Sequence, residues 1–312
     1  MVQRSKITVI GSANIDLVTE TNRYPKLGET LLGNKFHQFP GGKGANQAVA
    51  ASRLGAEVTF IGCVGQDDYG KQVIDNLTNE SVNVNHVIVN SSVETGIANI
   101  TVAEDDNAII VVPGANSMLA PEHIKSLEEI IHTSDVVVLQ LEIPIETVEA
   151  AVNIAYQKKI PVILNPAPAA KLSEDLLNKI TYITPNESEI AFLTSESEEA
   201  SIESLFANMY NHGSNYVIMT CGERGVFYGN PTNNLQHVKA CLVETIDTTG
   251  AGDTFNAAFA VSIATGKSIA DAIDYANSAA ALSVTKLGAQ TGMPTCKEVD
   301  IFISNKEKGK LQ

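Results

Sequence analysis

Residues 135–164 read DVVVLQLEIPIETVEAAVNIAYQKKIPVIL, and they contain the pattern from which the fold is predicted. The apolar run Val136–Leu139 is followed by a helix-like segment, Ile145 to Lys158, and then by a second apolar run, Val162–Leu164. Continuous rather than alternating apolar runs are typical of strands that are buried on both faces of a parallel sheet. We therefore predict a right-handed strand–helix–strand crossover here.

The same pattern recurs on both sides of this segment. Short apolar runs occur at Tyr182–Thr184 and Tyr216–Met219, separated by helix-length segments, and Ile7–Ile10 is predicted to be a central strand that ends at Gly11. This alternation predicts an α/β fold, a doubly wound and mostly parallel sheet with helices on both faces. Ligands of such sheets bind beyond the carboxyl ends of the strands, so polar residues just after each run are the first candidates for function.

The N-terminal third has a different pattern of apolar and polar residues. Residues 17–39 and about 95–112 are extended segments with more polar alternation, the second interrupted by a turn at Asp105–Asn107. Between them, Ala45–Leu54 is predicted to be a helix that Gly55 ends. The extended segments predict a small antiparallel sheet that projects as a lid over the strand ends. With no long linker, we expect residues 1–312 to form one domain whose polar tail, from Asn305, frays.

Composition excludes several classes of function. The 312 residues are 44% hydrophobic, and the length allows a large core without disulfides or metal. A net charge of −15 and the lack of Trp argue against nucleic-acid binding. Four isolated cysteines indicate a reducing compartment, and no apolar run approaches the ~18 residues of a membrane span. We therefore expect a cytoplasmic protein that binds neither nucleic acid nor membrane.

The strongest local motif is DTTGAGD at Asp247–Asp253, just before the helix-forming run Asn256–Ala264. Glycines on both sides of Ala251 let successive N–H groups point into one concavity, which is suited to a phosphoryl group at a helix N-terminus. Asp253 then has two possible roles. It could complement the helix dipole, or it could be a general base that takes a proton from an attacking hydroxyl.

A second glycine-rich segment, PGGKGANQ at residues 40–47, opens the predicted helix from Ala45. It is not a P-loop, because no Ser or Thr follows Lys43. GSANID at Gly11–Asp16 does not match G-x-G-x-x-G, which argues against a dehydrogenase. Amide, carboxylate and ammonium groups that converge on one pocket suit a polyol, and five side chains supply them: Asn14, Asp16, Lys43, Asn46 and Glu142.

Two further motifs are weaker. Asn186 and Glu189, three residues apart, could form a helix cap or could hold Mg²⁺ through water. TCGERG at Thr220–Gly225 lies between two strand-like segments and could be any glycine-containing hairpin.

Together these motifs resemble the ribokinase-type branch of the PfkB carbohydrate kinase family, from Ile7 to about Pro294. The two family signatures correspond to Gly41–Gly65 and Asp247–Phe259. Other segments resemble this branch in particular, namely NID at 14–16, LE at 141–142, NPAP at 165–168, NESE at 186–189 and GAQ at 288–290. The resemblance implies ATP-dependent, in-line phosphorylation of the 5-hydroxyl of D-ribose, giving D-ribose 5-phosphate and ADP.

The resemblance also implies the site. The base would be Asp253, with an anion hole from Gly250, Ala251 and Gly252. The sugar would be bound by Asn14, Asp16, Gly42, Lys43, Gly44, Ala45, Asn46, Glu142 and Asp253. ATP would be bound by Asn186, Thr220, Cys221, Gly222, Glu223, Arg224, Gly225, Gly252, Asp253 and Asn277, with Glu189 near Mg²⁺ through water. An activating K⁺ would be bound, mostly through backbone carbonyls, by Asp247, Thr249, Ser283, Lys286, Gly288 and Gly292. The lid of this family often pairs with a second lid, which implies a homodimer.

Two alternatives stay open. A sibling kinase of the family could act on another sugar or on a nucleoside, although these loops lack the aromatic or apolar partners that a base would need. A non-catalytic sugar-binding or nucleotide-binding protein could keep the same fold, although an intact Asp253 argues against it.

Overall fold

The computed structural model of the protein describes residues 4–104 and 106–308. Its main sheet has eight strands in the order β14-β13-β12-β11-β10-β9-β1-β4, and the pairings are parallel except for β12–β13 and β13–β14. The strands are β1 (Lys6–Ile10), β4 (Glu57–Ile61), β9 (Val136–Leu139), β10 (Val162–Leu164), β11 (Tyr182–Ile183), β12 (Val217–Thr220), β13 (Val226–Asn230) and β14 (Asn233–Val238).

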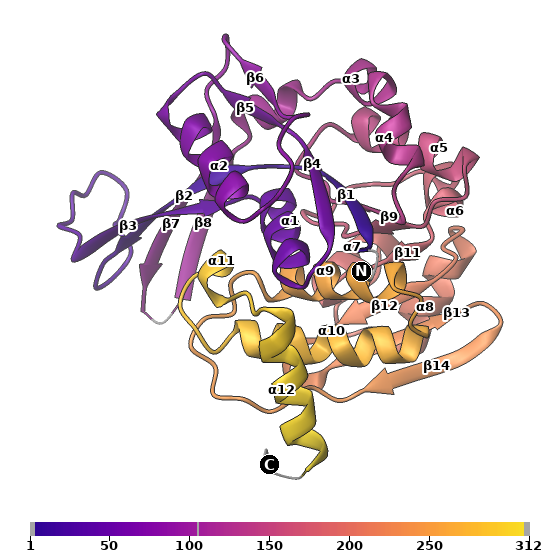
Figure 1. Ribbon diagram of the computed structural model, residues 1–312. Helices are drawn as coiled ribbons and strands as arrows, with labels where there is room; N and C mark the ends of the chain where they lie inside the picture. The colour runs from indigo at the N-terminus through magenta and orange to yellow at the C-terminus, as the bar shows by residue number, and fades with distance from the viewer. Residues whose placement is uncertain (1–3, 105, 309–312) are drawn as a thin grey trace.

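Helices cover both faces of this sheet (Figure 1). One face packs against α1 (Lys43–Arg53), α2 (Asp68–Asn79), α9 (Ala251–Ala264), α10 (Ile269–Ser283) and α12 (Cys296–Glu307). The other packs against α3 (Pro121–Ser126), α4 (Glu128–His132), α5 (Ile145–Gln157), α6 (Glu174–Lys179), α7 (Glu187–Thr194) and α8 (Ile202–Asn211). The predicted doubly wound α/β fold is confirmed. None of the helices in the described ranges is long and apolar enough to cross a membrane.

The strand β9 shows why a continuous apolar run suits this fold. All four of its residues are buried, because successive side chains point to opposite faces. Val136 and Val138 belong to the core beneath α1 and α9, and Val137 and Leu139 belong to the core beneath α5. A parallel strand with helices on both sides therefore needs an apolar residue at every position.

The lid is a four-stranded sheet in the order β3-β2-β7-β8, which projects to the left of the main domain in Figure 1. Its strands are β2 (Asn14–Glu20), β3 (Lys35–Gly41), β7 (Gly96–Ala103) and β8 (Asp106–Val112). Two pairings are antiparallel as expected, but β2 and β7 run parallel. Both strands begin beside the main sheet, with Asn14 opposite Gly96, and run outward, so they must share a direction.

Several strands and helices begin or end at other residues than predicted. Within the predicted extended segment 17–39, the stretch between β2 and β3 is irregular, and β3 begins only at Lys35. Asp106 and Asn107 lie in β8 rather than in a turn, and Asp105 is outside the described residues. The helix predicted from Asn256 begins at Ala251. Asn305 does not start a frayed tail, because α12 continues to Glu307, and residues 309–312 lie outside the described part.

The remaining elements are short. They are the two-stranded sheet of β5 (Cys63–Gly65) and β6 (Ile88–Asn90), the 3-10 turns η1 (Gly114–Met118) and η2 (Gly222–Arg224), and α11 (Ala289–Gly292).

Candidate active site

Two cavities meet at the carboxyl edge of the main sheet. The first has a volume of about 650 Å³ and lies between this edge and the lid, from which Ala98, Ile100, Ile109 and Val111 contribute. Its polar lining includes Asn14, Asp16, Gly42, Lys43, Asn46, Asn116, Glu142 and Asp253. The polar residues predicted to converge after the separate strands therefore do share one pocket, beneath an apolar roof.

The second cavity, of about 530 Å³, lies over the β12–β13 hairpin and α10. Six of the residues predicted to bind ATP line it, namely Thr220, Gly222, Glu223, Gly225, Gly252 and Asn277. Much of the remaining wall is apolar and includes Ala240, Leu242, Val243, Phe255, Ala280 and Val284. This wall could not be predicted from the sequence, because single alanines and valines carry no motif.

Residues 248–253 form the partition between the two cavities. Thr249, Gly250 and Asp253 line the first cavity, whereas Thr248, Ala251 and Gly252 line the second. A group held in one cavity can therefore approach a group held in the other across the N-terminus of α9. This is the position at which backbone N–H groups and the helix dipole favour an anion.

Glycine is needed in the partition. Gly250 has φ 79°, in the left-handed region, and it precedes the first residue of α9. A Cβ on Gly252 would meet nothing within 4 Å, so this backbone is open to an approaching group. The N–H of Ala251 donates to the carbonyl of Thr248 at 3.2 Å, so of the three predicted anion-hole residues this one already has a partner.

The carboxylate of Asp253 is buried in the first turn of α9, with only 7% of the residue exposed. Asn46 Nδ2 donates to Oδ2 at 3.0 Å, and Gln47 Nε2 donates to Oδ1 at 2.9 Å. Burial raises the pKa of this carboxyl, while the Lys43 ammonium and the two amides act to lower it. Asp253 thus faces the first cavity rather than solvent. A general base must face the bound substrate, whereas an acid that only complements the helix dipole can face solvent.

The two amides are themselves held in a fixed orientation. Gln140 Nε2 donates to Gln47 Oε1 at 2.6 Å, and Gln290 Nε2 donates to Asn46 Oδ1 at 3.0 Å. Gln47, Gln140 and Gln290 were not among the residues predicted for the site. A buried glutamine in the alanine-rich α1, next to Asn46, was the signal available for Gln47.

Like charges crowd the first cavity. Burial, with the carboxylates of Glu142 and Asp253, raises the pKa of Asp16 to about 7, and Lys43 opposes the rise. Burial lowers the pKa of Lys43, but four surrounding acids, Asp253, Glu142, Glu189 and Asp16, raise it to a net value above normal. The ammonium therefore stays charged, among acceptors suited to hydroxyl donors.

Other predicted residues of this cavity shape the backbone. Gly42 precedes α1 with φ 86°, and a Cβ there would meet the Cα of Ala13 at 2.7 Å. The helix has no cap from its own N-cap side chain, and Glu142 Oε2 accepts from the N–H of Lys43 at 3.1 Å instead. Gly44 and Ala45 are buried, and their N–H groups donate to Ser12 rather than into the cavity.

The predicted nucleotide residues divide into two groups. Asn186 and Glu189 form a capping box at the start of α7, so the predicted helix cap is present. Burial raises the pKa of Glu189, whose carboxyl also interacts electrostatically with Lys43 and Asp253. Asn186 forms a parallel bridge to Thr220. Cys221 is buried in the core, and Arg224 pairs with Glu187, so neither is among the residues that line the second cavity.

The predicted K⁺ residues gather at one place behind the partition. The Asp247 carboxylate accepts from the N–H groups of Thr249 at 2.9 Å and Gly288 at 2.7 Å. Burial raises its pKa, but these hydrogen bonds, with that of the Thr249 hydroxyl, bring it below normal. A Cβ on Gly292 would meet the carbonyl of Ser283 and lie 3.7 Å from that of Lys286. Residues 4–104 and 106–308 contain no group of three His, Cys, Asp or Glu side chains placed to bind a metal.

Comparisons with known proteins agree with this geometry. The family model "pfkB family carbohydrate kinase" matches residues 4–296. The chain is 44% identical over 298 residues to the ribokinase of Bacillus subtilis, covering 96% of this chain and 99% of that one. It is 36% identical over 305 residues to the deoxyribokinase of Salmonella typhi, with coverages of 96% and 99%. The structure of Arabidopsis thaliana ribokinase complexed with ribose and ATP is similar, with a TM-score of 0.89 and 31% identity, covering 96% of this chain and 99% of that one. The family match includes every residue that lines the two cavities.

Proposed function

The chain belongs to the pfkB family of carbohydrate kinases, and from this premise we propose that it transfers the terminal phosphoryl group of ATP to the 5-hydroxyl of D-ribose, giving D-ribose 5-phosphate and ADP. One observation carries the assignment of roles. The Asp253 carboxylate opens to the first cavity, and Gly252 beside it opens to the second. Ribose in the first cavity and ATP in the second would meet at the residue that can remove the proton.

The residues of the first cavity bind and orient the sugar. The carboxylates of Asp16 and Glu142 accept from ribose hydroxyls, and the side chains of Asn14 and Asn46 hold it against α1. Asp253 accepts the proton of the 5-hydroxyl as its oxygen attacks the phosphorus in line with the leaving ADP oxygen. Positioning of this kind supplies much of the rate of a phosphoryl transfer.

The partition stabilises the charge that develops on the transferred group. Gly250, Ala251 and Gly252 would supply the N–H donors of an anion hole at the start of α9, and preorganised donors of this kind are typically worth about 10²–10³ in rate each. Lys43 keeps its positive charge between the acids of the site and complements the phosphoryl oxygens as they approach Asp253. ATP lies along Thr220–Gly225 and Asn277, with its base against the apolar wall.

Two cations belong to the proposal. Mg²⁺, when bound with ATP, neutralises phosphate charge, and Glu189 would hold it through water. K⁺ would be bound by Asp247, Thr249, Ser283, Lys286, Gly288 and Gly292, and the carbonyl oxygens of Ser283 and Lys286 both lie within 4 Å of the position that a Cβ on Gly292 would take. These residues fit an alkali cation because they offer neutral oxygens and one carboxylate whose pKa is below normal.

We also propose that residues 1–312 act as one unit in which the lid closes over the sugar and pairs with a second copy. Ile109, Ile110, Val111 and Val112 are exposed apolar residues on the edge strand β8, with Ile110 68% exposed. Such an edge is a template for another strand. Sedimentation should show a dimer, and Ile110→Lys should yield monomers.

We further propose that the protein works in the cytoplasm. All four cysteines, Cys63, Cys221, Cys241 and Cys296, are free thiols in the structure. Free thiols persist in a reducing compartment. Cell fractionation tests this assignment.

A substrate panel tests the function. ADP production should be measured with ribose, deoxyribose, fructose and adenosine at matched concentrations, and ribose should give the highest kcat/KM. Deoxyribose is the sharpest competitor, because a deoxyribokinase is among the relatives. Adenosine as the best substrate would overturn the sugar assignment, and ribose binding without ADP formation would indicate a non-catalytic binding protein.

A further inference from the structure

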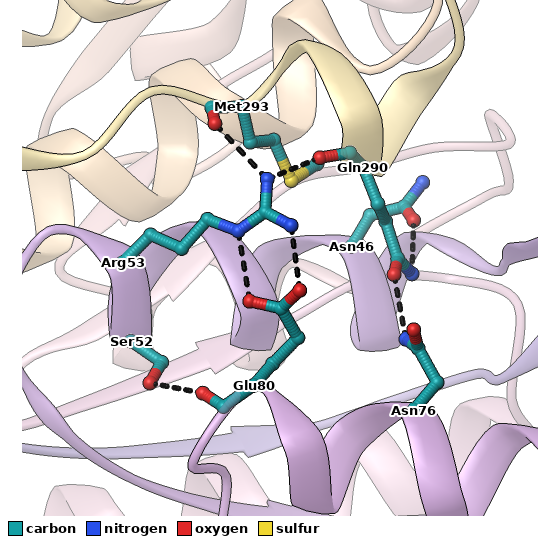
Figure 2. A network of polar contacts seen from close by, with 7 residues as sticks. All are labelled: Asn46, Ser52, Arg53, Asn76, Glu80, Gln290 and Met293. Atoms are coloured by element: carbon teal, nitrogen blue, oxygen red, sulfur yellow. Dashed lines mark hydrogen bonds and ion pairs between the residues drawn. The ribbon is translucent and has the colours of Figure 1, made fainter. Parts of the chain in front are cut away.

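Gln290 lies outside both cavities, yet its side chain is held at both ends (Figure 2). Nε2 donates to Asn46 Oδ1 at 3.0 Å, and Oε1 accepts from Asn76 Nδ2 at 2.7 Å. The residue sits in α11, immediately behind the partition, and is only 8% exposed. Its amide therefore connects α2 with the residue that holds Asp253.

The backbone of Gln290 is also clamped (Figure 2). Arg53 Nη1 donates to the carbonyls of Gln290 and Met293, the latter at 3.0 Å. The same guanidinium forms a bidentate pair with Glu80, at 2.8 and 2.6 Å. Since planar guanidinium–carboxylate pairs are geometrically specific, α11 is kept at a fixed distance from α1 and α2. These main-chain contacts hold Gln290 in place independently of the hydrogen bonds that its side chain makes.

These contacts form a directed chain of amides. Asn76 donates to Gln290, Gln290 donates to Asn46, and Asn46 donates to Oδ2 of Asp253 at 3.0 Å. The oxygen and the NH₂ group of a side-chain amide are similar in size, but the oxygen accepts hydrogen bonds and the NH₂ group donates them. Asn46 can therefore present its NH₂ to Asp253 only while its oxygen is engaged by a donor on the other side.

We propose that Gln290 is a positioning residue of the kinase, which sets the orientation of Asn46 and, through it, the Asp253 carboxylate. This inference rests on the proposed role of Asp253 as the base. With the amide of Asn46 reversed, its oxygen would face Oδ2, and the repulsion would turn the carboxylate away from the sugar hydroxyl. Gln47 would still hold Oδ1, so the defect is misorientation rather than collapse of the site.

The central test removes the donor and keeps the shape. Gln290→Glu presents only acceptors to Asn46, which then reverses its amide to donate to the new carboxylate. We expect kcat with ribose to fall at least about 10-fold, because a displacement of about 1 Å near the chemistry can cost about 10²-fold. The KM for ATP should not change, because none of the amides in the chain lines the second cavity.

A second pair of variants acts from α2 and separates orientation from packing. In Asn76→Asp the carboxylate attracts Gln290 Nε2, which reverses the chain and should reproduce the fall in kcat. In Asn76→Leu the donor to Oε1 is lost, but Gln290 can still donate to Asn46, so the fall should be about 3-fold or less. Asn79→Asp, exposed on the same helix, adds the same charge and should match the wild type.

The pattern of results decides the proposal. A larger loss in Asn76→Asp than in Asn76→Leu, at equal thermal stability and unchanged KM for ATP, supports it. Equal losses in both, or full activity in Gln290→Glu, would overturn it while leaving the base assignment intact. If Gln290→Glu does not fold, the comparison between the two Asn76 variants alone decides the proposal. A wild-type protein that binds ribose but forms no ADP would overturn the proposed function and this inference together.

Discussion

The carboxylate of Asp253 and the side-chain amide of Gln47 lie 2.9 Å apart, with Nε2 donating to Oδ1. Asn46 donates to the second oxygen, so both carboxylate oxygens accept a hydrogen bond from α1. A carboxylate fits this arrangement, whereas a neutral side chain with a donor of its own does not. The two amides therefore stabilise the ionised form, against the burial that raises the pKa of this carboxyl.

Replacing this carboxylate should separate binding from chemistry. In Asp253→Asn the fold and ribose binding should persist, while kcat falls by about 10²–10⁴, the typical contribution of a general base. One amide donor would face the new NH₂ group, so a loss of about 1–3 kcal/mol in unfolding free energy is expected as well. A coupled ADP assay, calorimetry with ribose and thermal unfolding measure the three effects. Turnover equal to that of the wild type would remove Asp253 from the role of base.

Sugar affinity should depend on pH through Asp16. Burial and the carboxylates of Glu142 and Asp253 raise its pKa to about 7, so in the free enzyme it is largely protonated below neutrality. Because the ionised form can accept from two hydroxyls, the KM for ribose should fall as the pH rises from about 6 to about 8. In Asp16→Asn this dependence should disappear and the KM should be higher throughout. The same slope in both proteins would assign the pH effect to another group.

The same carboxyl should lower stability at high pH. Its folded pKa of about 7 lies above the normal value of 3.8, so the ionised form is disfavoured in the folded state. The cost is absent below about pH 4, grows as the pH rises towards 7 and is then constant. Asp16→Asn should therefore be more stable than the wild type at about pH 8, by at most about 4 kcal/mol, and should lose this advantage in acid. Urea unfolding at both pH values measures the difference; equal stability at about pH 8 would contradict the sign.

Turnover should depend on K⁺. Replacing K⁺ with Na⁺ or with a bulky organic cation at equal ionic strength should lower kcat, because a cation of another size would fit poorly between the oxygens around Asp247. Gly292→Ala should have the same effect in K⁺ itself, since its Cβ would meet the carbonyl of Ser283 and displace a proposed ligand. ADP formation measured across the cation series checks both. Indifference of the wild type to the cation would count against the site.

The main sheet could be predicted because its signals are local. Every residue of Val136–Leu139 is apolar, and burial on both faces is the state in which such a strand is stable. The partly antiparallel lid was predicted less well, because the parallel pairing of β2 with β7 joins strands about 80 residues apart and has no turn signal between them. The residues of the two glycine-rich segments were predictable as candidates because glycines beside Lys43 and Asp253 allow the backbone to approach a ligand closely.

The fold class and the two glycine-rich segments follow from short-range patterns of residue type, whereas the role of Asp253 as a base came from the family resemblance and not from its spacing. The pairing of each Asp253 oxygen with its amide, and the division of two cavities by residues 248–253, depend instead on the folded chain. Gln140 orients Gln47 across 93 positions, and Gln290 orients Asn46 across 244. The orientation and burial of a side-chain amide are set by the residues that pack against it. When those residues are so far away in the sequence, only folding brings them into contact.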